Sequence, residues 1–122
     1  MEQSKTSLSA GLVVRELLKG CTDKVYPIVA SNATLPYISY RRRAIQTVDT
    51  KSRPSDTVQI EVNVFAETYE SSVALAETVR SKLEYNQAEV EGLRMRSCVL
   101  SDSEEGWESD AYYQTLIFDI KI

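Results

Sequence analysis

The residue types that most often carry catalysis or bind transition metals are sparse in this sequence. None of its 122 residues is histidine, which is the commonest general base and the commonest transition-metal ligand in proteins. A serine–histidine triad and a histidine-containing zinc site are therefore excluded. Glycine-rich phosphate loops of the GxGxxG and GxxxxGK types are absent from the sequence as well. The sequence predicts no catalytic residue, no cofactor and no enzymatic activity.

Two cysteines remain as possible nucleophiles or redox groups. Cys21 and Cys98 stand far apart, in neither CxxC nor zinc-ligand spacing. A reactive thiol needs a neighbouring group that lowers its pKa, and neither LLKGCTDK nor MRSCVL supplies an obvious one. We expect two reduced thiols that are mostly buried.

An acidic segment, residues 102–110, is dense enough in carboxylates to suggest a calcium loop. An EF-hand loop needs oxygen ligands at alternate positions, a central glycine, a bidentate Glu at its twelfth position and flanking helices. Here Gly106 stands directly before Trp107, and both flanking segments have the pattern of strands. The segment is therefore predicted to be a solvated acidic connection without a metal. Its carboxylates belong to Asp102, Glu104, Glu105, Glu108 and Asp110.

A basic triplet, Arg41, Arg42 and Arg43, is the one concentrated positive patch. Tyr37 and Tyr40 lie beside it, and interleaved basic and aromatic residues are typical of grooves for single-stranded nucleic acid. These two tyrosines fall on opposite faces of one predicted strand, however, and the net charge of −4 opposes phosphate binding. We expect no sequence-specific nucleic-acid partner, and a solvated strand end is the simplest interpretation of the triplet.

Length and composition indicate a single domain, residues 1–122, with residues 1–6 as a flexible tail. An apolar content of 43% is enough for one compact core. No apolar run approaches the roughly 20 residues that span a bilayer, and the start lacks the apolar region and cleavage site of a signal peptide. We expect a soluble protein that is made in the cytosol and has no membrane partner.

Apolar spacing predicts two helices. The first covers residues 8–19, with Ser7 or Ser9 as its cap and Gly20 at its end. The second follows Thr68, a capping residue, and continues to about residue 84. The apolar faces are Leu8, Leu12, Val14, Leu17 and Leu18 in the first helix, and Tyr69, Val73, Ala76, Val79 and Leu83 in the second.

Strands are predicted over residues 37–48, 57–65, 93–101 and 112–122, and a short edge strand over residues 24–28 is interrupted by Pro27. The inward faces of two of them are Val58, Ile60, Val62 and Val64, and Leu116, Phe118, Ile120 and Ile122. The predicted class is α+β: a mainly antiparallel four-stranded sheet, plus the short edge strand, with two helices packed on one face. The opposite face carries Phe65, Tyr113 and Ile117 among polar side chains, so a partner subunit could cover part of it.

Two segments in their order along the chain are similar to a known family. VYPIVASNATLPYISYRRR, residues 25–43, is followed by DTVQIEVNVFAETYESSVALAETVRSKLE, residues 56–84. Together with the first helix and the two final strands, they resemble the tail-completion or tail-terminator proteins of tailed phages and prophages, over residues 8–122. Each motif alone has low specificity, and the resemblance rests on the ordered series.

The resemblance implies a structural protein of the virion without catalytic residues. It implies copies that form a ring, a hexamer, at the head-proximal end of the tail tube, where the ring stops tube growth and contributes to head–tail joining. The implied partners are other copies of the chain, the tail-tube protein and the head–tail connector proteins, and synthesis takes place in the host cytoplasm. A small α+β ligand-binding or regulatory module that acts as a homo-oligomer is the alternative, and it predicts an enclosed apolar pocket.

A ring requires a contact between two different patches of each subunit. The candidate patches are Arg41, Arg42 and Arg43 on one side, and Asp102, Glu104 and Glu105 on the other. They either pair across subunits, or stay solvated, or pair within one chain. Trp107 either packs within its own domain or anchors the interface. The polar turn of residues 49–55 could project toward the tube or the lumen and become ordered only on assembly.

Overall fold

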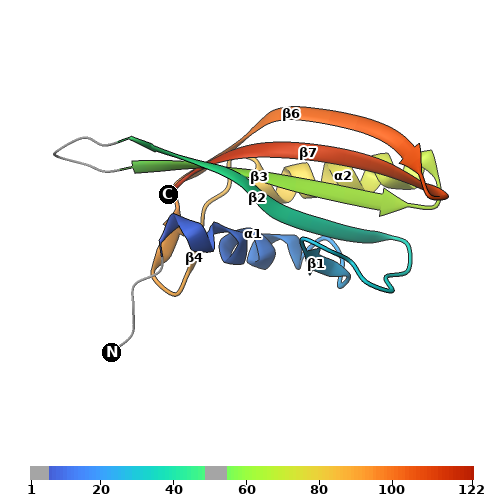
Figure 1. The fold of residues 1–122 in the computed structure, drawn as a ribbon, viewed down its shortest axis with the longest axis horizontal. Coiled ribbons are helices and arrows are strands. Elements are labelled where there is room, and N and C mark those ends of the chain that lie inside the picture. The colour runs from blue at the N-terminus through green and yellow to red at the C-terminus, as the bar shows by residue number, and fades with distance from the viewer. Residues whose placement is uncertain (1–5, 49–54) are drawn as a thin grey trace.

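The computed structural model describes residues 6–48 and 55–122. Most of the expected flexible tail, and all but the last residue of the predicted turn, lie outside the described residues. Figure 1 shows the elements in an elongated molecule. They are the 3₁₀ helix η1 (Ser7–Ser9), the helices α1 (Ala10–Leu18) and α2 (Tyr69–Leu83), and the strands β1 (Val25–Pro27), β2 (Tyr37–Val48), β3 (Ser55–Ala66), β4 (Ala88–Val90), β5 (Leu93–Met95), β6 (Ser97–Glu108) and β7 (Ala111–Lys121).

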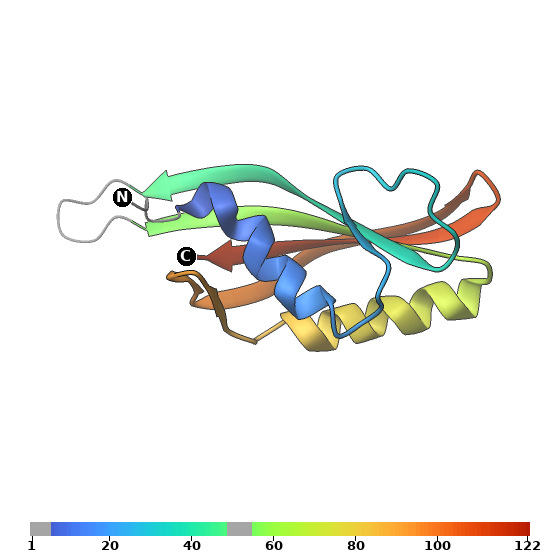
Figure 2. The ribbon, with the colours of Figure 1, turned by 90° about the horizontal axis from the view of Figure 1, so that it is seen from below.

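The main sheet has five strands in the order β1-β2-β3-β7-β6. β1 lies at an edge, as predicted from Pro27, and runs parallel to β2, whereas the other neighbours are antiparallel. The sheet is therefore mixed and mostly antiparallel. Figure 2 shows both helices on the same face of it, which confirms that part of the predicted α+β architecture. Neither described helix is both long and apolar enough to cross a membrane.

The predicted strand over residues 93–101 is wrong in its bounds. Its first part, β5, pairs with β4 in a separate two-stranded sheet that the sequence did not indicate. Its second part continues as β6 through the acidic segment as far as Glu108. The predicted acidic connection is thus mainly an edge strand, and the turn is Ser109 and Asp110, both at positive φ. Charged residues have low strand propensity, but a short hairpin turn and a central partner strand impose pairing on them.

The core lies between the central strands and the helices. Val58, Ile60, Val62 and Val64 of β3 are fully buried, as predicted, and so is Phe118 of β7. Their period of two places one apolar row of each strand against α1 and α2. The buried residues that complete this layer include Val14, Leu18, Ile38, Val79, Leu83 and Cys98.

The two helix starts differ from each other in how well the sequence predicts them. Thr68 Oγ1 accepts a hydrogen bond from the Ser71 backbone N–H at 3.1 Å, which confirms the predicted cap of α2. At the first helix, Thr6 caps a 3₁₀ turn before α1 begins. The 3₁₀ turn takes Leu8 out of phase with α1. Within α1 itself, rotation by about 100° per residue turns Leu12 away from the buried Val14. Leu8 and Leu12, predicted to face the core, are instead 66% and 38% exposed.

A row of aromatic side chains crosses the sheet face opposite the helices. The rings of Tyr37 and Phe65 stack with centroids 4.7 Å apart, and Phe65 contacts Tyr113 at 6.3 Å. Tyr113 lies across Gly106, its register partner on β6. A Cβ built on Gly106 would stand 2.5 Å from Tyr113 Oη, so the absence of a side chain there is what lets the ring lie flat on the edge strand.

Replacing Gly106 with alanine should therefore destabilise the fold by about 1–2 kcal/mol, because the Tyr113 ring must move off the strand. The measurement is urea unfolding followed by circular dichroism. The matched control is the same replacement in a Tyr113→Ala background, where the added methyl group meets no ring and the cost should disappear. An equal cost in both backgrounds would show that the ring is not the reason.

Candidate functional site

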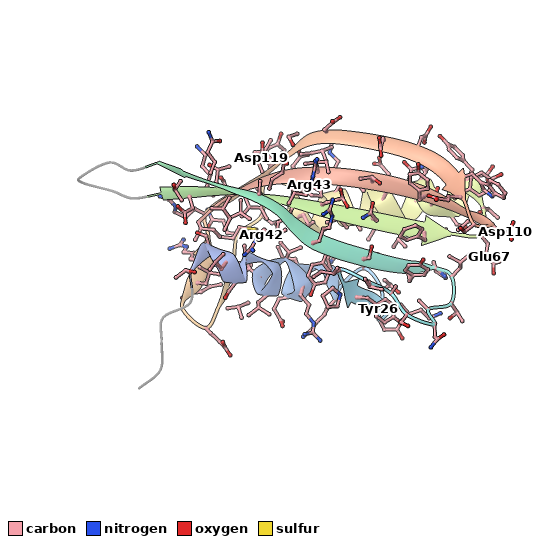
Figure 3. The ribbon with its side chains drawn as sticks, viewed as in Figure 1. Tyr26, Arg42, Arg43, Glu67, Asp110 and Asp119 are labelled. Atoms are coloured by element: carbon pink, nitrogen blue, oxygen red, sulfur yellow. The ribbon has the colours of Figure 1, made fainter. Side chains whose placement is uncertain are left out.

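The three predicted interface arginines do not share one face. A β-bulge at residues 42–44 of β2 changes the alternation of side chains. Arg41 and Arg43 lie over the open sheet face, where their Nε atoms are 3.0 and 3.9 Å from the Glu61 carboxylate. Arg42 points to the helix side and donates a hydrogen bond to the Leu8 carbonyl at 2.9 Å. Figure 3 shows Arg42 above α1 and Arg43 over the sheet.

Glu61 holds two of these arginines within the chain. Its side chain is 18% exposed, and burial by itself would raise its pKa. Hydrogen bonds from Arg41 and Asn63, together with the charges of Arg41 and Arg43, outweigh burial and lower the pKa of Glu61. One carboxylate faces two guanidinium groups, so the cluster of Arg41, Arg43 and Glu61 keeps a net positive charge. Pairing within one chain is therefore present, but it is incomplete.

The predicted acidic patch lies on the opposite edge of the sheet. Asp102, Glu104 and Glu108 are exposed on β6, and no ion pair joins them to another described residue. Glu105 differs, because it accepts hydrogen bonds from Tyr69 at 2.9 Å and from Gln114 at 3.0 Å. This carboxylate therefore ties the start of α2 to the β6–β7 hairpin.

The open face brings members of the two patches around one polar hollow. Arg43, Asp102 and Glu104 line a space of about 180 Å³ together with Glu61. Arg43 and the β6 carboxylates are not paired across it. β2 and β6 lie near opposite sides of the sheet. We call residues 41–48 of β2 the basic edge, after its arginines, and residues 102–108 of β6 the acidic edge, after its carboxylates.

Trp107 is 59% exposed near the end of β6. Its register partner, Tyr112, contacts Tyr69 of α2 with ring centroids 6.2 Å apart. Since directly opposed residues of two paired strands share a face, Trp107 lies on the helix side of the sheet. The interpretation that Trp107 packs into its own domain is wrong. Its role as an interface anchor stays a prediction.

An apolar groove between α1 and the β1 edge was missed by the sequence analysis. It has a volume of about 550 Å³, and Leu8 and Ile28 on its wall are 66% and 71% exposed. The apolar pair Ile28 and Val29 directly after a proline was the signal that could have indicated it. The residues that line it are Leu8, Ser9, Gly11, Leu12, Pro27, Ile28, Tyr40, Arg41 and Arg42.

Both thiols are held in the protonated form. Burial raises the pKa of the Cys98 thiol to about 12, and burial also raises the pKa of the half-buried Cys21. A nucleophilic cysteine needs the opposite shift. Within the described part of the chain, no three His, Cys, Asp or Glu side chains are grouped so that they could hold a metal ion.

Glu61 makes stability depend on pH in a defined direction. Its pKa is lower in the folded than in the unfolded chain, so its contribution is present above the unfolded pKa and is lost as the pH falls through the folded pKa. Glu61→Gln should lower the free energy of unfolding by about 1 kcal/mol near neutral pH. The difference should vanish in strong acid. Urea unfolding across the acid range measures it, and the exposed Glu89→Gln should show no comparable loss.

Comparisons with known proteins identify the family and the fold. Residues 6–122 match the family model described as "Tail completion protein gp17". A solved chain from "Virion of native gene transfer agent (GTA) particle" has a TM-score of 0.77 at 14% identity, over 95% of this chain and 98% of that one, which shows a shared fold. No curated protein sequence matches significantly. Because the family model spans nearly all of the described fold, the chain belongs to the tail completion protein gp17 family of phage tail structural proteins.

Proposed function

We propose that copies of this chain form a ring that completes the tail tube at its head-proximal end. The observation that carries the ring is the placement of two unlike surfaces near opposite edges of one sheet. The basic edge and apolar groove lie at one side, and the acidic edge with Trp107 lies at the other. A contact between unlike patches repeats head to tail, and it produces a ring when the rotation between neighbours closes.

Family membership supports the place of this ring in the virion. The ring, a hexamer, stops the polymerisation of the tail-tube protein and presents its other side to the head–tail connector proteins. The chain is made in the host cytoplasm and acts in the assembled particle. Its role is non-enzymatic: it contributes binding surfaces, and the raised pKa values of both thiols agree with this.

A ligand-binding or regulatory module is the alternative, and it requires an enclosed apolar pocket. The 550 Å³ hollow is lined by Leu8 and Ile28, which are 66% and 71% exposed. Small-molecule sites usually bury most of their ligand. A shallow apolar groove with a charged rim fits a protein surface better, so the alternative is not favoured.

Tube assembly in the presence and absence of the protein tests the proposed function. The tail-tube protein of the same phage should polymerise into tubes of unregulated length on its own. When the protein is added, we expect shorter tubes with a ring density at one end, seen by negative-stain electron microscopy. Tubes of unregulated length with bare ends in its presence would contradict tube termination.

Charge reversal tests the part that the arginines play in the ring. Arg42→Glu combined with Arg43→Glu should abolish rings at moderate salt while the protomer stays folded, because both changes make the basic edge negative where the acidic edge of a neighbouring copy approaches it. Light scattering measures the assembly mass and circular dichroism the fold. A ring of unchanged mass would remove these two arginines from the contact.

A further inference from the structure

We propose, on the basis of the ring put forward above, that neighbouring copies join their sheets edge to edge. The acidic edge of one copy pairs antiparallel with the basic edge of a second copy, and Trp107 enters the apolar groove of that second copy. The occupant of the groove is thus another molecule of the same chain. This goes beyond charge attraction, because it specifies which backbone groups and which apolar anchor make the contact.

The basic edge is open because β1 is short. β1 pairs with β2 only at Ile38, Ser39 and Tyr40. Pro27, its last residue, has no N–H to donate, and Ile28 makes the last hydrogen bond, from its N–H to the Tyr40 carbonyl at 2.7 Å. Ile28 has a φ of 62°, unusual for a β-branched residue, and turns the chain away from β2. No described strand covers residues 41–48.

The acidic edge is open for a different reason. The end of α2 occupies the first part of the outer edge of β6: Glu84 accepts the Leu100 N–H at 2.9 Å, and the Tyr85 N–H donates to the Cys98 carbonyl at 2.8 Å. Beyond Leu100, no described backbone segment covers the outer edge of β6. The Ser103 N–H donates only to the carboxylate of its neighbour Asp102, at 2.8 Å. An uncovered strand edge is a template for another strand.

The charges select one pairing of edges among the possible ones. Two acidic edges or two basic edges placed side by side would repel. When unlike edges pair antiparallel, Glu108 of the acidic edge lies opposite Arg41 of the basic edge, next to Arg42 and Arg43, and the edges attract. The contact is then head to tail and not two-fold symmetric. A second copy of this chain supplies the complementary charge and strand length, so no other partner is needed.

The basic edge and the acidic edge have the same number of pairing positions, and the side chains that become paired lie on the same face of the sheet. Arg43 is the extra residue of the bulge, so residues 41–48 offer seven pairing positions, the same as residues 102–108. Pairing over this full length places Trp107 opposite Arg42. Both side chains lie on the helix side, where Arg42 also lines the apolar groove. The β-bulge between Leu100 and Asp102 shifts the alternation of β6 by one residue. The backbone groups of Ser103 and Trp107 therefore point outward, as the Leu100 N–H does.

The joint also requires neighbouring copies to be staggered. Arg41 and Asp102 stand in one row across the sheet, through Glu61 and Ile117. From this row the basic edge continues toward one end of the molecule and the acidic edge toward the other. Pairing the two edges therefore shifts each copy along the strands, and the strands in the ring are tilted to its axis, as in closed barrels.

Two variants that each break one side of the joint test it. Ser103→Pro removes an outward N–H from the acidic edge, and an edge strand tolerates proline. Leu12→Glu places a charge in the apolar groove on the exposed side of α1. Each variant alone should be a folded monomer by light scattering and circular dichroism. Mixed in equal amounts they should form dimers and no rings, because one intact edge meets one intact groove.

The control variants change the same two residues to side chains that should not prevent the contact. Ser103→Ala and Leu12→Met should form rings like the original chain. Trp107→Ala should raise the concentration at half-assembly at least tenfold, whereas Tyr85→Ala, which removes a 79% exposed ring outside both surfaces, should leave it unchanged. Trp107→Ala also provides the test of the acidic edge if Ser103→Pro does not fold.

The outcomes separate this contact from the proposed function. Rings that persist in both blocking variants, or monomeric variants that fail to dimerise when mixed, contradict the edge-to-edge joint while the ring stands. An original chain that stays monomeric at every concentration, both alone and with tail tubes, contradicts the ring and the joint together.

Discussion

Every strand of an open sheet needs partners for its backbone N–H and C=O groups on two sides, and the outermost strands lack one of them. In this protein the interior of the sheet meets the requirement fully, because β3 and β7 each have two antiparallel neighbours. Their fully buried apolar rows hold α1 and α2 on one face. Different segments cover part of each edge strand, and the portions that they leave uncovered are the surfaces on which another chain could pair.

At each edge of the sheet, a neighbouring segment or side chain covers part of the edge strand and leaves the rest of it unpaired. β1 covers the first residues of β2 and then turns away at Pro27 and Ile28. Glu84 covers the outer edge of β6 as far as Leu100. The open portions carry opposite charges, which keeps like edges of separate molecules apart. In the ring proposed for this member of the tail completion protein gp17 family, the opposite charges of the open edges favour contacts between unlike edges.

The sequence allowed the apolar framework to be predicted because its signals are local. Alternation at Val58, Ile60, Val62 and Val64 requires a strand with one buried face, and Thr68 marks the start of α2 by the hydrogen bond that its hydroxyl can accept. The buried face of the first helix was predicted wrongly for two residues. Leu8 belongs to the 3₁₀ turn, and Leu12 lies on the side of α1 away from Val14. The predicted end of the strand that became β6 was wrong, because its strand conformation comes from pairing with β7 rather than from its own Ser, Asp and Glu residues.

The sequence by itself therefore determined the α+β class, the buried rows, the absence of histidine chemistry and the presence of a basic and an acidic segment. Only the tertiary structure decided where those segments lie, since cross-strand register is a property of residues far apart in the chain. A bulge in β2 places Arg42 on the opposite face of the sheet from Arg41 and Arg43, and these two arginines form ion pairs with Glu61. The tertiary structure also left Trp107 exposed on the helix side and opened a groove beside α1. Local spacing fixes which face of a strand is apolar, whereas pairing across the sheet fixes which edges and side chains remain free for a partner.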